Sequence, residues 1–409
     1  MTSLKISPKT YAWIVVGLLW VVAFLNYFDR ILITSMRDPI VNAFMINDAQ
    51  FGLLTSVFLW SYGVLSPLGG YFADRYGRKP VIIFSVAVWS LVTLWTGFAQ
   101  SFHEMVAARM CMGLSEAFYI PAALALITDY HKSSTRSLAT GIQMSGLYAG
   151  LALGGLGGYI SELWGWRSGF QIFGFFGILY AVILMFSLKK PADPVREKEV
   201  VSQEPVSAPI RLGQTFKLFS YLSFRILLFY FCAYGIVNWL IYGWLPTFLK
   251  SHFHLGLGEA GISATGYVQI GSFAGVLLGG FLADRWYQFN KRGRIYIVII
   301  GFTIGAPFLF LMSFTYSFGV AIASMIVYGV ARGFNDANLM PVLCQVIDEK
   351  YIATGYGFLN FLSTIVGGLM VFVGGVLRDS HVSLSLIYGG SAVLLLLTAW
   401  SLLFIRIKK

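Results

Sequence analysis

Apolar stretches of about twenty residues recur from one end of this 409-residue sequence to the other. A helix of that length crosses the roughly 30 Å hydrocarbon core of a bilayer. Hydrophobic residues make up 57% of the chain and charged residues 11%, which leaves too few polar side chains to cover a soluble protein. The sequence therefore predicts an all-α integral membrane protein whose surroundings are the lipid bilayer.

The apolar runs predict twelve transmembrane helices joined by short loops. The first six spans are expected at 11–34, 49–72, 80–100, 104–130, 136–160 and 168–188, and the second six at 220–249, 258–283, 294–314, 317–346, 351–376 and 383–405. Residues 189–217 carry four prolines among alternating charges, which is typical of a linker. We therefore expect a six-helix bundle over 1–188, a cytoplasmic linker over 189–217 and a second six-helix bundle over 218–409.

The formal net charge of +11 could suggest a nucleic-acid partner, but the positions of the basic residues predict otherwise. Most of the 29 Lys and Arg fall in the termini, the linker and the loops on one side of the predicted bundle. This positive-inside pattern places both termini in the cytoplasm, and an even number of spans also requires them on one side. We expect a monomeric multi-pass protein of the cytoplasmic (inner) membrane, with no nucleic-acid partner.

The two halves of the sequence repeat each other. Gly69-Gly70-Tyr71-Phe72-Ala73-Asp74-Arg75 returns as Gly279-Gly280-Phe281-Leu282-Ala283-Asp284-Arg285. Gly113, Glu116 and Pro121 in the fourth span are matched, at identical spacing, by Gly333, Asp336 and Pro341 in the tenth. The repeat predicts two pseudo-symmetric halves with the substrate site between them, near the middle of the membrane.

The residues of the first repeat carry a family resemblance. Gly69-Gly70-x-x-Ala73-Asp74-Arg75-x-Gly77-Arg78-Lys79 resembles the signature loop of the major facilitator superfamily. Asn26-Tyr27-Phe28-Asp29-Arg30, Arg109-x6-Glu116-Ala117 and Gly165-Trp166-Arg167 resemble its anion:cation symporter branch, which includes bacterial sugar-acid/proton symporters and vesicular glutamate and sialic-acid carriers. Spinster-type lipid transporters share much of the same pattern. The resemblance implies a major facilitator fold that works by alternating access.

Two departures from the branch bear on the substrate class. Tyr62 in the second span is followed by Ser66, where sugar-acid symporters usually carry a glutamine. The middle of the seventh span lacks the arginine that some organic-anion members have.

Six charged residues lie deep inside predicted spans, where each costs about 2.5–3.5 kcal/mol. They are Asp29, Arg30, Arg109, Glu116, Arg332 and Asp336. The guanidinium of Arg30 offers a planar fork that suits a carboxylate, and the resemblance implies that it contacts the substrate carboxylate while Asp29 titrates. The alternative for Arg30 is a side chain that reaches to the lipid headgroups.

Glu116 is the principal candidate for proton coupling, because a carboxyl group in a low-dielectric cavity can exchange a proton near neutral pH. Arg109 lies two helical turns before it, about 10.5 Å along the helix axis, and shares its face. The alternative is that Glu116 forms a structural ion pair with Arg30 or Arg109. Arg332 and Asp336 are four residues apart and can pair along one helix, so a structural role and a transport role stay equally open for them.

The remaining candidates are polar side chains expected to face the site: Tyr27, Tyr62, Gln143, Asn238, Tyr242, Gln269, Asn335, Asn338 and Asn360. Hydroxyl and amide groups suit a polyhydroxylated acid, although each can equally join helices by hydrogen bonds. Asn360 also matches a family position that contacts substrate.

The repeated loop is expected to act as a gate. Gly70 and its neighbour allow helices to approach closely, and the charges can clasp helix ends in one state and release them in the other. The expected gating residues are Gly70, Asp74, Arg75, Arg78, Asp284 and Arg285. The same charges also determine topology.

These observations predict a proton-coupled symporter of a small organic anion, with a sugar acid such as a hexuronate, aldonate or sialate as substrate, and the resemblance implies that it works as an importer. A lysolipid transporter of the Spinster type and a sodium-coupled sugar transporter are the alternatives; sodium coupling would make Asn26 and Asp29 the first candidates. No nucleophile elbow, phosphate loop or metal-ligand spacing occurs in the sequence, so we expect no enzyme activity, no cofactor and no metal.

Overall fold

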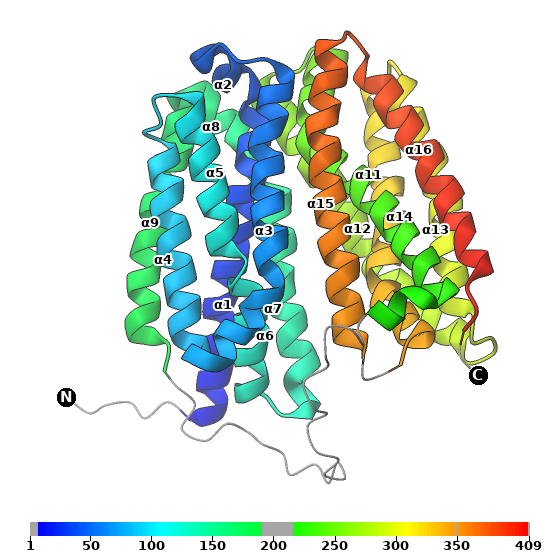
Figure 1. The fold of residues 1–409 in the computed structure, drawn as a ribbon. Coiled ribbons are helices and arrows are strands. Elements are labelled where there is room, and N and C mark those ends of the chain that lie inside the picture. The colour runs from blue at the N-terminus through cyan, green and yellow to red at the C-terminus, as the bar shows by residue number, and fades with distance from the viewer. Residues whose placement is uncertain (1–6, 190–215, 349–350, 408–409) are drawn as a thin grey trace.

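The computed structural model describes residues 7–189, 216–348 and 351–407. The described part is helical throughout and contains no β-strand. Figure 1 shows two bundles side by side, the first in blue to green and the second in green to red. Helix α1 begins and η5 ends at the same end of the molecule, which we call the terminal end; the opposite end, where α2 lies, is the far end. Of the predicted linker 189–217, residues 190–215 lie outside the described residues.

The helices follow the predicted spans closely. The first bundle consists of α1 (Pro8–Leu32), η1 (Ile33–Met36), α2 (Arg37–Phe44), α3 (Asp48–Tyr76), α4 (Arg78–Thr96), α5 (Phe102–Glu116), α6 (Tyr119–Tyr130), α7 (Ser133–Leu153), η2 (Gly154–Leu156), α8 (Gly157–Trp164) and α9 (Trp166–Ser187). The second consists of η3 (Phe216–Ser220), α11 (Leu222–Phe253), α12 (Leu257–Tyr287), α13 (Gly293–Phe314), α14 (Phe318–Val346), α15 (Ile352–Asp379), α16 (Leu384–Ser401) and η5 (Leu402–Phe404).

The described residues contain ten helices long and apolar enough to cross a membrane, and eleven when the two bent parts of α3 count as one span. The bend of α3, 55° between Ser66 and Leu68, falls at Pro67, which has no amide hydrogen for the helix ladder. The predicted span 136–160 corresponds to α7, η2 and α8. All-helical membrane architecture is therefore confirmed, and the count of spans is confirmed for ten or eleven of the twelve.

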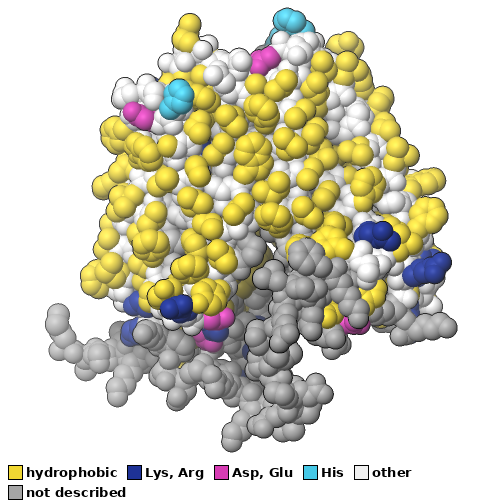
Figure 2. Space-filling view, viewed as in Figure 1, with side chains coloured by type: hydrophobic (Ala, Val, Ile, Leu, Met, Phe, Trp, Pro, Cys, Tyr) yellow, Lys and Arg dark blue, Asp and Glu magenta, His cyan; other side chains and the backbone are white. Residues whose placement is uncertain are grey.

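Large hydrophobic side chains cover the outer surface of both bundles. Figure 2 shows them across the middle of the visible face, with Lys and Arg near the terminal end and His near the far end. Phe175, Phe186, Phe281 and Leu397 are each more than 60% exposed. Side chains of this kind are stable at such exposure when hydrocarbon surrounds them.

The predicted span 104–130 is broken in the structure. Helix α5 ends at Glu116, and α6 starts at Tyr119 after a two-residue turn. Pro121 explains the break, because it cannot donate a backbone hydrogen bond to the carbonyl of Ala117. In the repeat-related helix, α14 continues through Pro341 without a break. Residues Phe102–Tyr130 still form one membrane span, as predicted, and the break places Glu116 at a helix end inside it.

The two bundles meet along two helix pairs, α3 with α15 and α7–α8 with α12. Ser56 Oγ donates to the carbonyl of Gly368 over 2.6 Å, and Trp60 Nε1 donates to that of Ile365 over 3.1 Å. On the other side, Thr265 Oγ1 donates to the carbonyl of Ala152 over 2.7 Å. In the described part of the chain, the hydrogen bonds and ion pairs that join the bundles lie in the half of the molecule toward the far end.

Glycines permit this close approach. A Cβ atom on Gly375 would collide with the carbonyl of Asp48, and Gly155 and Gly261 would each collide with the other's carbonyl. Backbones that pack this closely favour small residues at the contact. The far end is therefore closed by direct backbone packing as well as by polar contacts.

Candidate substrate and coupling site

A buried ion pair lies in the first bundle, between α1 and the broken end of α5. Arg30 Nε donates to Glu116 Oε2 over 2.7 Å, and the two side chains are 3% and 0% exposed. Neither Arg30 Nη2 nor Glu116 Oε1 has a hydrogen-bond partner among the described residues. The pair therefore has one unused donor and one unused acceptor, which makes it suited to exchange partners.

Aromatic rings surround the guanidinium of Arg30. Its central carbon lies 4.5 Å from the ring centroid of Tyr27, 4.4 Å from that of Tyr62 and 5.2 Å from that of Phe58. Ring faces attract a cation without neutralising it. Tyr27 and Tyr62, both predicted site residues, thus hold Arg30 in place while its charge stays available to an anion.

Arg109 lies on the other side of Phe58, with its guanidinium carbon 4.8 Å from the ring centroid. Its Nε donates to the carbonyl of Leu54 over 3.3 Å, and its Nη2 has no hydrogen-bond partner among the described residues. The sequence left the partner of Glu116 open between Arg30 and Arg109, and in the structure the ion pair is with Arg30. Arg109 nevertheless lies within electrostatic range of Glu116 and Asp29.

Asp29 and Asn26 complete this group on α1. Thr93 Oγ1 donates to Asp29 Oδ2 over 3.3 Å, while Asp29 Oδ1 has no hydrogen-bond partner among the described residues. Asn26 is completely buried beside Glu116, and neither atom of its amide forms a well-aligned hydrogen bond among the described residues. Polar atoms buried in this way are costly, so the group is a place where protons, ions or substrate atoms are expected to bind.

The second bundle contains the repeat-related pair, Arg332 and Asp336 on α14. Arg332 Nε lies 3.6 Å from Asp336 Oδ2, too far for a hydrogen bond. Asp336 Oδ1 instead accepts from Tyr234 Oη over 2.7 Å and from Asn335 Nδ2 over 3.2 Å. Tyr230 Oη donates to Asn335 Oδ1 over 2.6 Å, which fixes that amide. Hydrogen bonds from Tyr234 on α11 and from Asn335 thus hold the Asp336 carboxylate more closely than Arg332 does.

Tyrosines connect the two bundles at this level. Tyr242 is 5.1 Å from the guanidinium carbon of Arg332, measured to the ring centroid, and its hydroxyl accepts from Gln269 Nε2 over 2.9 Å. Tyr27 lies within electrostatic range of Tyr242, and both belong to the apolar cluster around Ile31. Arg30 and Arg332 therefore flank a single group of tyrosines.

Two members of this group were missed in the sequence. Tyr148 on α7 lies within electrostatic range of Arg332, Asp336, Tyr242 and Tyr27. Tyr356 on α15 interacts with Tyr62 and Asp336 and is 39% exposed, although most of this group is buried. Helix α15 begins at the terminal end, so Tyr356 connects the buried group with the surface on that side. Nothing distinguishes these tyrosines from others in the sequence, because their neighbours come from other helices.

Two other predicted site residues form hydrogen bonds that join helices within a single bundle. Gln143 Nε2 donates to Tyr119 Oη over 3.3 Å, within the core of the first bundle. Asn338 Nδ2 donates to the carbonyl of Gly279 over 3.3 Å and joins α14 to α12. Asn238 and Asn360 are partly buried, on α11 and α15. Their roles in substrate binding stay predictions.

The predicted gating residues at the terminal end interact within their own bundles. Arg78 pairs with Asp129 and donates to the carbonyl of Ala125 over 2.8 Å. Arg75 donates to Tyr71 Oη over 2.7 Å, and Asp284 pairs with Arg294 at 2.9 Å. The remaining members, Gly70, Asp74 and Arg285, are partly or fully exposed. A latch between helix ends at this end stays a prediction.

An ion-pair network that sequence reasoning missed closes the far end. Asp48, at the start of α3, accepts from Arg37 Nε over 2.6 Å and from Arg378 Nε over 2.8 Å. Lys250 pairs with Asp38. Asp379 of α15 accepts from the backbone amides of Asp48 and Ala49, each over 2.9 Å. One signal was present in the sequence: Arg37, Lys250 and Arg378 are among the few basic residues on the sparsely charged side.

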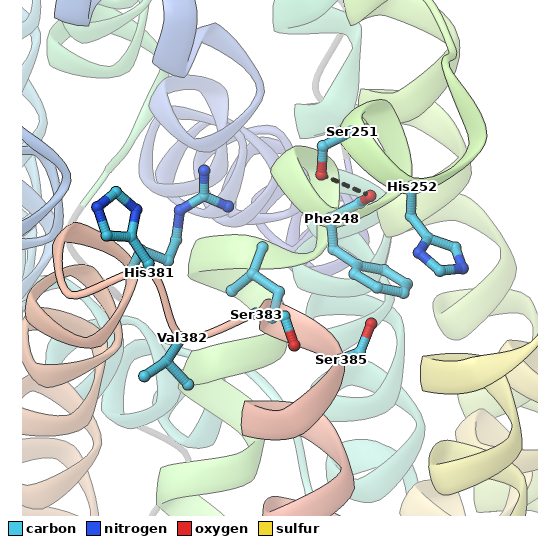
Figure 3. A pocket seen from close by; sticks show the side chains of 9 residues that line it. Phe248, Ser251, His252, His381, Val382, Ser383 and Ser385 are labelled. Carbon is cyan, nitrogen blue, oxygen red and sulfur yellow. Dashed lines mark hydrogen bonds between the residues drawn. The ribbon is translucent and has the colours of Figure 1, made fainter.

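A cavity of about 300 Å³ adjoins this network in the second bundle. Figure 3 shows His252 and His381 on opposite sides of it, with Ser383 and Ser385 between them. Arg378 also lines this cavity, while its Nε is bound to Asp48. The cavity thus belongs to the closed far end rather than to the group around Arg30.

An all-helical membrane bundle, built from two repeated halves with ion pairs buried in each, defines the class of the molecule as a membrane transporter. Residues 19–371 match the family model of the Major Facilitator Superfamily. The chain belongs to this superfamily.

Its curated relatives are named as transporters of two kinds. A probable sulfoacetate transporter of Cupriavidus necator is 26% identical over 96% of this chain and 93% of its own length. A hexuronate transporter of Bacillus subtilis is 24% identical over 93% and 92%. Spinster homolog 1 of Rattus norvegicus is 29% identical over 88% of this chain and 71% of its own length. The expected resemblance to the sugar-acid branch is confirmed, and so is the overlap with Spinster proteins.

A solved structure shares the fold. A bacterial homologue of the human lysosomal transporter Spinster, in an inward-facing and occupied conformation, superposes with a TM-score of 0.78 at 23% identity, covering 97% of both chains. The unoccupied form of that protein gives 0.76. This similarity confirms the major facilitator fold.

Proposed function

We propose that this chain is a proton-coupled importer of a small organic anion, with a sugar acid as substrate. The observation that carries the proposal is the buried pair of Arg30 and Glu116, joined at 2.7 Å. A buried guanidinium that already binds one carboxylate is able to bind another in its place, since the planar fork fits both alike.

Proton coupling follows from competition for Arg30. While Glu116 is ionised, its Oε2 occupies Arg30 Nε. A proton on Glu116 removes the negative charge, and Arg30 Nε together with the unused Nη2 becomes available to a substrate carboxylate. Loss of the proton restores the internal pair and expels the anion. Substrate and proton therefore bind together and leave together, which is symport.

The closed far end supports alternating access. With the termini in the cytoplasm of an inner membrane, as the positive-inside pattern predicts, the far end is external and this conformation faces inward. The exposed Asp74 belongs to a terminal-end latch that forms when the far end opens. Import then requires the Asp48–Arg378 contact to break and re-form once in each cycle.

The substrate class rests on the site and on the relatives together. Tyr27 and Tyr62 lie against Arg30, Tyr242 lies against Arg332, and Tyr148 packs beside Tyr242. The hydroxyl groups of these tyrosines suit a polyhydroxylated chain. Relatives named for hexuronate and for galactarate and glucarate transport match most of this chain. These two observations favour a sugar acid over an apolar anion.

Uptake into proteoliposomes tests the proposal. The protein would be offered labelled hexuronate, aldonate, aldarate, sialate and a neutral sugar, with and without an inward proton gradient. We expect one acid to accumulate against its gradient in the wild type. Glu116→Gln should lose accumulation but keep exchange of internal for external acid, because a permanently neutral side chain leaves Arg30 free.

Glu259→Gln is the matched control, since Glu259 is exposed in the first turn of α12, and it should transport like the wild type. Accumulation driven by sodium alone would overturn proton coupling and make Asn26 and Asp29 the cation site. Absence of acid uptake under every gradient would overturn the organic-anion function itself.

A lysolipid transporter of the Spinster type is the second candidate. A cavity of about 310 Å³ between α3, α4 and the turn before α6 is lined only by apolar or aromatic side chains, namely Phe72, Tyr76, Pro80, Val81, Phe84 and Phe118. An acyl chain fits such a lining better than a sugar acid does. Transfer of a labelled lysolipid between leaflets, together with no uptake of any acid, would favour this function.

A further inference from the structure

We propose that the substrate is a dianion, with one anionic group bound by Arg30 and the other by Arg332 of the second bundle. This inference rests on the proposed organic-anion function and specifies its substrate class. An acid that engages one arginine from each bundle would also hold the two halves together when it binds.

Arg332 is bound less closely by a carboxylate than Arg30 is. Its side chain is 7% exposed, and its Nε has no hydrogen-bond partner among the described residues. Its nearest acid, Asp336, lies 3.6 Å away, because Tyr234 and Asn335 hold that carboxylate from the other direction. Arg30, in contrast, is joined to Glu116 at 2.7 Å. Arg332 therefore keeps a counter-charge at 3.6 Å but no hydrogen bond to it, and a buried guanidinium with an unused donor is suited to bind an anion.

The position of Arg332 relative to Arg30 fits one ligand rather than two. Arg30 lies over Tyr27 and Arg332 lies over Tyr242, at 4.5 and 5.1 Å from the ring centroids. Tyr27 and Tyr148 pack against the same apolar cluster that contains Tyr242. The two guanidinium groups thus flank the same tyrosines, and a short polyhydroxylated chain between two acid groups matches that arrangement.

Two ligands that differ by a single carboxylate measure what the second anionic group contributes to binding. D-Glucarate and D-gluconate have the same six-carbon polyol chain, and glucarate carries one additional carboxylate; sorbitol carries none. Each would be titrated against the purified full-length protein at a pH where the acids are ionised. The rise of the unfolding temperature with ligand concentration gives the dissociation constants.

We expect glucarate to bind at least about tenfold more tightly than gluconate in the wild type, the effect of one bidentate arginine–carboxylate contact. Arg332→Gln should bring the ratio of the two constants close to one, and Arg332→Lys should give an intermediate ratio, because it keeps the charge but not the planar fork. Arg225→Gln, at an exposed position near the start of α11, should leave the ratio as in the wild type.

The outcomes separate this inference from the proposed function. Equal dissociation constants of glucarate and gluconate for the wild type would overturn the proposal of a dianionic substrate, and the proposed organic-anion transport would still stand. This comparison does not depend on the folding of any variant. A tenfold preference that survives Arg332→Gln would also overturn it, since another residue would then read the second carboxylate. Stabilisation by neither acid would overturn the proposed function first.

Discussion

The contact between Asp48 and Arg378 gives the most direct mechanical prediction. Asp48 accepts from Arg37 within its own bundle and from Arg378 across the interface, at 2.6 and 2.8 Å. Asp48→Asn keeps the shape of the side chain and removes its charge. Because Arg378 comes from the other bundle, the substitution weakens the closed far end specifically.

The magnitude follows from burial. A hydrogen bond to a charged group contributes about 1.5–3 kcal/mol, but the Asp48 and Arg378 side chains are 11% and 20% exposed, so solvent screens part of this. The retained amide preserves a neutral hydrogen bond. We therefore expect a shift of about 1–2 kcal/mol toward the open far end, which is a change of roughly 5- to 30-fold in the ratio of the two conformations.

Spin labels measure this ratio. Labels at Ala43→Cys and Ser380→Cys, both exposed at the far end, would report the distance across it after the three native cysteines are replaced. The population at long distance should increase in Asp48→Asn. Glu104→Gln, at a side chain that accepts from the backbone amide of Gln100 inside the first bundle, should leave the distribution unchanged. The same distribution in Asp48→Asn and the wild type would refute the assignment of this contact as a gate.

Three further predictions follow from single contacts. Arg30→Lys should lower acid uptake at least about 100-fold at sub-saturating substrate, because a lysine lacks the planar fork; uptake close to the wild type would show that Arg30 does not bind the carboxylate. Gly375→Val should open the far end without any change of charge, since its side chain would strike the carbonyl of Asp48, and unchanged label distances would contradict this. Asp74→Asn should enlarge the inward-facing population in the same experiment by removing the terminal-end latch, and a shift toward the outward-facing form would exclude that role.

The membrane fold was predictable because lipid imposes one strong constraint: a spanning segment must satisfy its own backbone, and apolar length reveals it. The six intramembrane charges were predictable for the same reason, since each is costly in hydrocarbon. The structure indeed places Arg30 against Glu116 and Arg332 near Asp336. Sequence spacing alone had left the partner of Glu116 open between Arg30 and Arg109.

What the sequence did not reveal depends on contacts between distant helices. Tyr148 and Tyr356 acquire their significance only from the second bundle and from Tyr62. Asp48 and Asp379 lie at helix ends, and their contacts across the interface depend on how the two bundles pack. The break after Glu116 was not predictable from the presence of Pro121 alone. In the tenth span the helix continues through the corresponding Pro341.

Proton binding by the purified protein tests the central claim most directly. In weakly buffered solution, at a pH where the acid is fully ionised, a saturating amount of the transported acid would be added and the pH change recorded. If Glu116 must be neutral for Arg30 to bind substrate, the wild type should take up protons as the acid binds, and Glu116→Gln should bind the acid without taking up protons. Saturating binding to the wild type with no proton uptake would contradict the account.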